Sequence, residues 1–167
     1  MKKYIRKCYF YVAWLFSKLV LILPYKFSVG ILSNVIGWLA YYLVADARKK
    51  ARKHLTMCFP DKKQQEINTI IKTIFKYEAK NFFEMLNFPK MSNDFLDSIA
   101  KLEQNQKDIF NKLLERKKGL LILGGHIGNW ELIAAGIARN YSLNVIAKKI
   151  YIEELNNMLV KYRNMKN

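Results

Sequence analysis

The chain has 167 residues, and its 29 Lys and Arg against 13 Asp and Glu give a formal net charge of +16. With 51% hydrophobic and 14% aromatic residues, it is neither a disordered basic tail nor a neutral soluble enzyme. The length allows one domain, or one domain with a membrane-attached extension. The charge indicates an anionic partner, and composition alone does not separate nucleic acid from anionic lipid.

Residues 1–46 are predicted to be a membrane-anchoring helical segment. A basic start, "MKKYIRK", precedes an apolar stretch, and residues 27–45 then contain no charge. This second stretch approaches the ~20 residues that cross a bilayer. A spanning helix, a shallow hairpin made with the preceding segment, and an interfacial helix rich in Trp and Tyr all remain open. The alternative without a membrane is a core helix of a soluble domain.

A cluster of five cations follows the apolar segment directly. It consists of Arg48, Lys49, Lys50, Arg52 and Lys53. A polybasic stretch in this place meets lipid headgroups, with ~1 kcal/mol for each contact near an anionic leaflet. A solvated helix face or an RNA-binding patch are the alternatives. The position beside the apolar segment favours a membrane surface. Because no aromatic residues are interleaved with the charges, we expect no nucleic acid as the partner.

An amphipathic helix is predicted from Asp61 onward. Apolar residues recur at three- and four-residue steps from Ile67 to Leu86, and Asp61 with Gln64 has the spacing of an N-cap and its partner. Pro89 is expected to end this helix, and Ser92 is available to cap the next. The pattern is most simply explained by packing.

The remaining chain alternates between helical and strand-like patterns. Helices are predicted through 112–118, at 129–140 and at 151–163, and buried strands at 119–123 and 143–148. This order predicts an α/β fold, in which N-terminal membrane-associated helices precede a parallel-rich sheet with flanking helices. Parallel sheets bind ligands at the carboxyl ends of their strands, and His126 follows such an end.

The stretch "LILGGHIGNWE", residues 121–131, carries the candidate chemistry. Glycines allow a sharp turn into a helix, whose first backbone N–H groups stabilise a phosphate or a developing oxyanion. His126 lies in this turn, and Glu131 lies in the first turn of the helix. A carboxylate on one ring nitrogen leaves the other to accept a proton from a substrate hydroxyl. The alternative is a structural histidine that only makes hydrogen bonds.

No metal or cofactor is expected. Cys8 and Cys58 lie far apart and in no ligand spacing, and neither another His nor a Cys lies near His126. The glycine turn lacks the GxxxxGK pattern of a phosphate-binding loop.

The segment "GGHIGNWE" resembles the HxxxxD/E motif of the glycerolipid acyltransferase superfamily. Its Gly-Asn-Trp-Glu ending is similar to the lipid A biosynthesis family of lauroyl and myristoyl acyltransferases. The segments "ARKHLTMCFPD" and "VIAKKIYIEELNNMLVKYRNMKN" also resemble segments of that family, and the order of anchor, basic segment, helix and motif agrees along the chain.

The resemblance implies an enzyme of the bacterial inner membrane, with its active site on the cytoplasmic side. It would transfer a fatty acyl chain from acyl carrier protein to a hydroxyl of a lipid A precursor, although coenzyme A stays open as the donor. His126 would be the general base and Glu131 its orienting carboxylate. The candidates for substrate binding are Lys148, Lys149, Arg163, Gly125 and Asn129.

The chain departs from the family in length, because members continue past the Arg163 segment. Residues 47–167 are therefore expected to be the N-terminal part of an acyltransferase α/β domain. The alternative function is a truncated, inactive, basic membrane-surface binding protein, in which the histidine and glutamate are structural.

Overall fold

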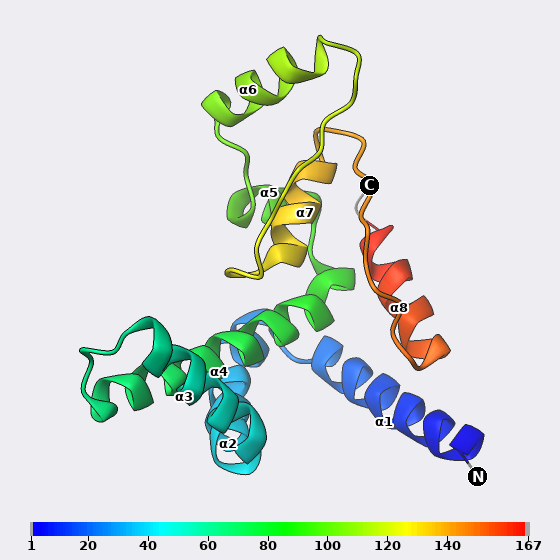
Figure 1. Ribbon diagram of the computed structural model, residues 1–167. Helices are drawn as coiled ribbons and strands as arrows, with labels where there is room; N and C mark the ends of the chain where they lie inside the picture. The colour runs from blue at the N-terminus through cyan, green and yellow to red at the C-terminus, as the bar shows by residue number, and fades with distance from the viewer. Residues whose placement is uncertain (1, 166–167) are drawn as a thin grey trace. The chain divides into compact units, whose positions relative to one another are not determined.

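The computed structural model describes residues 2–165, and its regular structure is helical (Figure 1). The chain forms two compact units. The hairpin unit comprises Leu15–Asn87, and the C-terminal unit joins Met1–Trp14 to Phe88–Asn167. The predicted domain boundary after residue 46 stays a prediction. The outer ends of the predicted domains, residues 1 and 166–167, lie outside the described residues.

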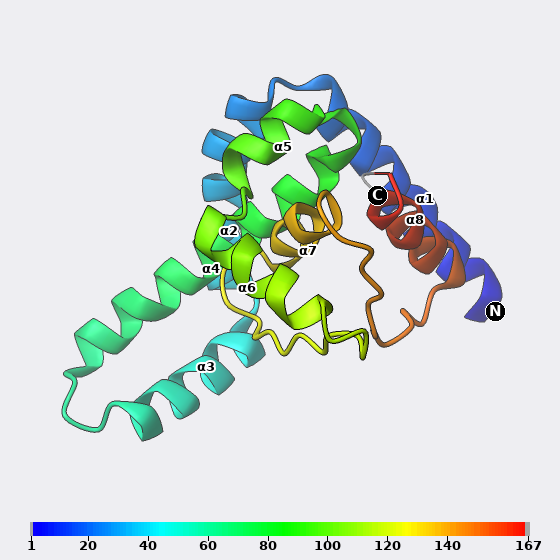
Figure 2. The ribbon, with the colours of Figure 1, turned by 90° about the horizontal axis from the view of Figure 1, so that it is seen from above.

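The hairpin unit is built from helices joined by short turns. In chain order these are the second half of α1 (Lys2–Ile22), the π-helix η1 (Lys26–Leu32), α2 (Ser33–Leu43), α3 (Ala45–Cys58) and α4 (Gln64–Asn87). Figure 2 shows α3 and the first half of α4 as the two arms of a helical hairpin. The fourth helix begins at Gln64, and Asp61 lies in the preceding turn, so the predicted N-cap at Asp61 is wrong.

Helix α4 supplies the core of the hairpin unit, as its apolar periodicity predicts. Near its start, Ile67 and Ile71 pack with Tyr41 of α2, and these side chains are almost wholly buried. Near its end, Phe83 and Leu86 pack against residues of α1 and η1 in a second cluster. Side chains three or four residues apart lie on the same face of a helix. One apolar face of α4 therefore contributes residues to both clusters.

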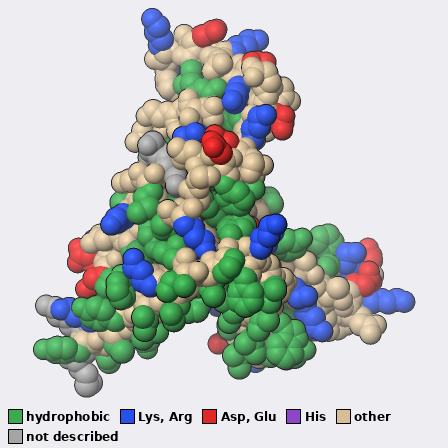
Figure 3. Space-filling view, turned by 180° about the vertical axis from the view of Figure 1, so that it is seen from behind, with side chains coloured by type: hydrophobic (Ala, Val, Ile, Leu, Met, Phe, Trp, Pro, Cys, Tyr) green, Lys and Arg blue, Asp and Glu red, His purple; other side chains and the backbone are tan. Residues whose placement is uncertain are grey.

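The faces of α1 and α2 that do not pack against the core leave large apolar side chains exposed. Figure 3 shows hydrophobic side chains gathered over these two helices. The exposed residues of η1 and α2 are Phe27, Ile31, Val35, Trp38, Leu39, Tyr42 and Leu43. Soluble monomers rarely expose such contiguous apolar surface, which marks contact with a membrane or a protein.

The apolar helices do not include a single membrane span. Among the described residues no helix alone has the length and composition to cross a bilayer. One bent pair, Tyr4–Ile22 with Lys26–Leu43, meets both requirements together, with an angle of 115° between its halves. The choice between a spanning helix, a shallow hairpin and an interfacial helix stays open.

Helix α3 carries the basic cluster and has no buried residue. Its inner side rests on α4, and Arg48 donates to the backbone carbonyls of Tyr41 and Tyr42. Within the described part of the chain, Lys49, Lys50 and Lys53 have no ion-pair partner. Their ammonium groups are available to an external anion.

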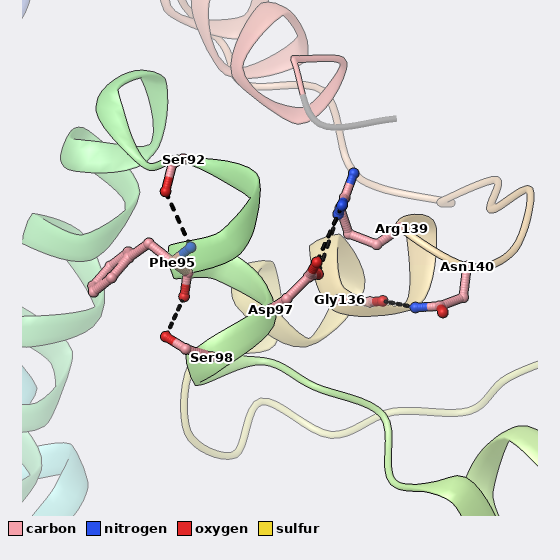
Figure 4. Close-up of polar contacts among 7 residues, drawn as sticks. All are labelled: Ser92, Phe95, Asp97, Ser98, Gly136, Arg139 and Asn140. Atoms are coloured by element: carbon pink, nitrogen blue, oxygen red, sulfur yellow. Dashed lines mark hydrogen bonds and ion pairs between the residues drawn. The ribbon is translucent and has the colours of Figure 1, made fainter.

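The C-terminal unit contains shorter helices. Besides the first half of α1 these are η2 (Phe88–Lys90), α5 (Asn93–Ile99), α6 (Gln104–Leu114), α7 (Trp130–Ala138) and α8 (Glu153–Arg163). Ser92 caps α5 as predicted, because its Oγ accepts the backbone N–H of Phe95 at 3.1 Å (Figure 4). The helix predicted through residues 112–118 lies earlier in the chain and ends at Leu114.

Helix α7 is fixed by its contact with α5. Arg139 donates from Nε and Nη2 to the two carboxylate oxygens of Asp97, at 3.2 and 3.1 Å (Figure 4). Gly136 permits the close approach, since a Cβ there would lie 2.0 Å from the carbonyl oxygen of Ala100. The glycine turn that contains His126 thus leads into a helix whose position against α5 is fixed by these contacts.

The predicted parallel sheet is wrong. Residues 119–123 and 143–148 have no regular secondary structure, and no strand occurs in residues 2–165. Leu121, Leu123 and Ile146 are 80%, 90% and 98% exposed. A parallel pair is stable only when helices cover its faces, and α7 packs on α5 instead. An apolar run of five or six residues therefore did not suffice to specify a strand.

Candidate active site

The glycine turn leads into α7 as the sequence predicts. Gly128 has a φ of +63°, a conformation that glycine adopts without the steric cost that a Cβ imposes. Asn129 then caps the helix, because its Oδ1 accepts the backbone N–H of Leu132 at 3.2 Å. Gly125 lies within this turn, where the chain has no helical structure. The turn thus places His126 just before a helix N-terminus.

The imidazole of His126 is exposed to solvent. Its only described contact is with the indole of Trp130, whose ring centroid lies 4.7 Å away at an interplanar angle of 65°. Within the described part of the chain, neither ring nitrogen makes a hydrogen bond. Both nitrogens are therefore accessible to a substrate.

The carboxylate of Glu131 is held by Arg163. The guanidinium donates from Nη2 to Oε1 at 2.6 Å and from Nε to Oε2 at 2.9 Å. Both side chains are partly buried, on α7 and α8 respectively. The hydrogen bonds to Glu131, opposed by burial and reinforced by its charge, raise the pKa of Arg163. The pair is a bidentate charge-assisted contact, the strongest kind between side chains.

The structure therefore joins two predicted site residues that the sequence had assigned to different roles. Glu131 was expected beside His126, and Arg163 was expected on the substrate. In this structure Glu131 and Arg163 bind each other, and no hydrogen bond among the described residues connects Glu131 with His126. The catalytic roles of His126 and Glu131 and the substrate-binding role of Arg163 stay predictions.

The predicted lysines lie on the irregular segment before α8. Lys148 and Lys149 are both exposed, and Lys149 Nζ is 3.8 Å from Glu153 Oε1 in a solvent-exposed pair. A pocket of about 520 Å³ is lined by Arg6, Lys149, Ile150, Tyr151, Glu153 and Glu154. Lys149 is thus the predicted binding residue that lines a described pocket.

Sequence reasoning missed two contacts in this region. Arg6 lies over the ring of Tyr151, 4.0 Å from its centroid, and donates to its hydroxyl. Sequence spacing gives no signal for a contact between residues so far apart. Trp130 was visible inside the motif, but its packing against His126 was not predicted.

Among the described residues, no group of three or more His, Cys, Asp or Glu side chains is arranged to hold a metal ion. Cys8 and Cys58 are both exposed and unpaired.

The family model described as bacterial lipid A biosynthesis acyltransferase matches residues 2–167. The chain belongs to this family. The match covers both compact units, so the resemblance inferred from the glycine turn and its flanks is confirmed. No curated protein and no solved structure matches the chain.

Membership in the lipid A acyltransferase family indicates a reaction class for the chain. The family transfers acyl groups in lipid A biosynthesis, so its substrates are an acyl donor and a lipid A precursor. An exposed imidazole before a helix N-terminus has the chemistry that such a transfer needs, a base beside oxyanion-stabilising N–H groups.

Proposed function

We propose that the chain transfers a fatty acyl chain from acyl carrier protein to a hydroxyl of a lipid A precursor, with His126 as the general base. The observation that carries this proposal is the exposed His126 imidazole, without a hydrogen bond among the described residues, directly before α7. A general base needs one ring nitrogen that a substrate hydroxyl can reach, and an exposed imidazole offers one.

The reaction proceeds in two steps. One nitrogen of His126 accepts the proton of the acceptor hydroxyl while the hydroxyl oxygen attacks the thioester carbonyl of the donor. The resulting oxyanion is stabilised by backbone N–H groups at the start of α7. The intermediate then expels the donor thiolate, which takes the proton from the imidazolium. The acceptor hydroxyl thus replaces the serine of a catalytic triad.

The remaining predicted residues assist this transfer. Lys148, Lys149 and Arg163 bind anionic groups of the substrates, and Gly125 and Asn129 shape the turn that receives the reacting carbonyl. Glu131 orients His126 once its carboxylate can reach the ring. Their support is the basic charge of the segment before α8 and the N-cap that Asn129 forms.

We further propose that the protein acts at the cytoplasmic face of the bacterial inner membrane. The exposed apolar residues of η1 and α2 would contact the lipid tails, and the unpaired lysines of α3 would contact anionic headgroups. The same positive charge suits an acidic carrier protein.

The experiment is an acyl-transfer assay with the full chain in vesicles that contain phosphatidylglycerol, an acyl carrier protein thioester and a lipid A precursor. His126→Ala is expected to lower turnover by ~10²–10⁴, the usual contribution of a general base. His54→Ala is the matched control, because His54 is exposed on α3 and is the second histidine of the chain. Equal turnover in the two variants would contradict the assignment of His126.

A second candidate function is favoured by the Glu131–Arg163 pair, which leaves His126 without its orienting carboxylate. The protein would then be an inactive, basic membrane-surface binding protein. It predicts vesicle binding that weakens with salt and no acyl transfer from either a carrier protein or a coenzyme A donor.

A further inference from the structure

The contact between Arg163 and Glu131 occupies both carboxylate oxygens. The two N–H groups approach along the parallel fork geometry, with donor–acceptor distances of 2.6 and 2.9 Å. The exposed fractions of the side chains are 31% for Arg163 and 18% for Glu131. Because this pair is partly buried and bidentate, it constrains the carboxylate more firmly than a fully exposed surface pair would.

His126 lies close in the chain to this carboxylate but does not bind it. Its ring rests against Trp130, the residue that precedes Glu131. In the described structure both ring nitrogens remain without hydrogen bonds. A guanidinium on the carboxylate also neutralises its charge, which weakens its ability to stabilise an imidazolium. The Glu131–Arg163 pair therefore keeps Glu131 from acting on His126, because it occupies both carboxylate oxygens and neutralises their charge.

We propose that Arg163 is a positioning residue, which withholds the Glu131 carboxylate from His126 until an external oxyanion replaces the carboxylate on the guanidinium. This inference rests on the proposed function, since it assumes that His126 and Glu131 act together. The arrangement makes formation of the His126–Glu131 pair depend on occupancy of Arg163.

A phosphate-type oxyanion has the chemistry to make this exchange. The planar guanidinium fork binds phosphate in the same bidentate way as carboxylate, and phosphate brings the larger negative charge. Arg163 is exposed enough to be reached from solvent, at 31% of its side-chain surface. Both a soluble phosphate group and the headgroup of an anionic lipid supply the required oxygens.

Ring nitrogen NMR of the full chain tests the proposal without requiring turnover. The protein has two histidines, so uniformly ¹⁵N-labelled imidazoles in phosphate-free, zwitterionic bicelles give one signal set for His126 and one for His54. Releasing the carboxylate in Arg163→Gln is expected to move both His126 ring signals toward a single hydrogen-bonded tautomer. The His54 signals are expected to stay in place. In the double variant Arg163→Gln with Glu131→Gln, the His126 displacement is expected to disappear.

The same spectra identify the source of the oxyanion. Titration of wild-type protein with inorganic phosphate is expected to displace the His126 signals saturably, and Glu131→Gln is expected to remove this response. In a second arm, phosphatidylglycerol is added to the bicelles without inorganic phosphate, and displacement of the His126 signals there would identify the lipid headgroup as the oxyanion. Displacement in either arm supports the exchange and names its source, and no displacement in both arms overturns it.

Arg163→Lys keeps the proposal testable if the glutamine variant does not fold. Lysine retains the charge but loses the bidentate geometry of the guanidinium. Without phosphate, we therefore expect a smaller displacement of the His126 signals than in Arg163→Gln. In the phosphate titration, we expect the displacement at a lower phosphate concentration than in wild type. Unchanged His126 signals in both Arg163 variants, with native far-UV circular dichroism, would overturn the proposal. Loss of acyl transfer in the vesicle assay would instead contradict the proposed function and leave these spectra unaffected.

Discussion

Helix α4 of the hairpin unit and the segments that flank α7 in the C-terminal unit bury their apolar residues to very different degrees. In the hairpin unit a single long helix, α4, places Ile67, Ile71 and Phe83 in clusters that exclude water almost completely. In the C-terminal unit the segments that flank α7 leave Leu121 and Ile146 exposed. The candidate site thus lies beside loosely packed segments, where side chains can rearrange at small cost.

The largest expected effect of a substitution lies in the hairpin unit. Phe83→Ala removes a fully buried ring and should lower the free energy of unfolding of that unit by ~3–5 kcal/mol. Amide hydrogen exchange of α4 in detergent measures this loss. Phe82→Ala is the matched control, because its ring is 45% exposed and should contribute about 1 kcal/mol. Similar losses for the two variants would contradict the core assignment.

A smaller loss of stability is expected at the close contact of α7 with Ala100 in the C-terminal unit. Gly136→Ala places a Cβ 2.0 Å from the carbonyl oxygen of Ala100, so the helices must separate, and we expect a loss of ~1–3 kcal/mol. Exchange protection of α5 and α7 reports it. Gly30→Ala in the hairpin unit has open space around the added Cβ and should be neutral or stabilising by up to ~1 kcal/mol. Equal stability of the two variants would rule out the close approach.

The smallest effect concerns the exposed Asp97–Arg139 contact. Hydrogen bonds from Arg139 lower the pKa of Asp97 below its ordinary value of 3.8. A lowered pKa stabilises the folded state above the unfolded value and loses this contribution as the pH falls through the folded value. The melting temperature of Asp97→Asn should therefore lie below that of wild type at neutral pH and approach it at pH values below 3.8.

The charge partner provides the control for Asp97. In an Arg139→Gln background, Asp97→Asn should cause little further loss, because the contact is already broken. A difference between wild type and Asp97→Asn that does not change with pH would contradict the assigned cause.

Local patterns predicted the helices well because their signals are contained in one element. The apolar stripe of α4, the cap at Ser92 and the turn before α7 all depend on residues a few positions apart. The predictions of strands at 119–123 and 143–148 were wrong for the opposite reason. A strand depends on a neighbour that hydrogen-bonds to it, and no apolar run of this length carries that information.

The candidate site divides in the same way. The sequence predicted His126 in a turn before a helix, and in the structure His126 lies in the turn before α7. It did not predict that Arg163, 32 residues along the chain from Glu131, would bind that carboxylate. Arg163 and Glu131 were chosen for their motif positions, and their pairing is a property of how α7 and α8 meet.

The most direct test of the account is a single-turnover measurement of acyl transfer by the full chain in anionic vesicles, with His126→Ala and His54→Ala compared at equal vesicle binding. If His126 is the base, His54→Ala transfers at the wild-type rate and His126→Ala is slower by ~10²–10⁴. Transfer by His126→Ala at the rate of His54→Ala would contradict the central claim that the exposed imidazole before α7 is the base.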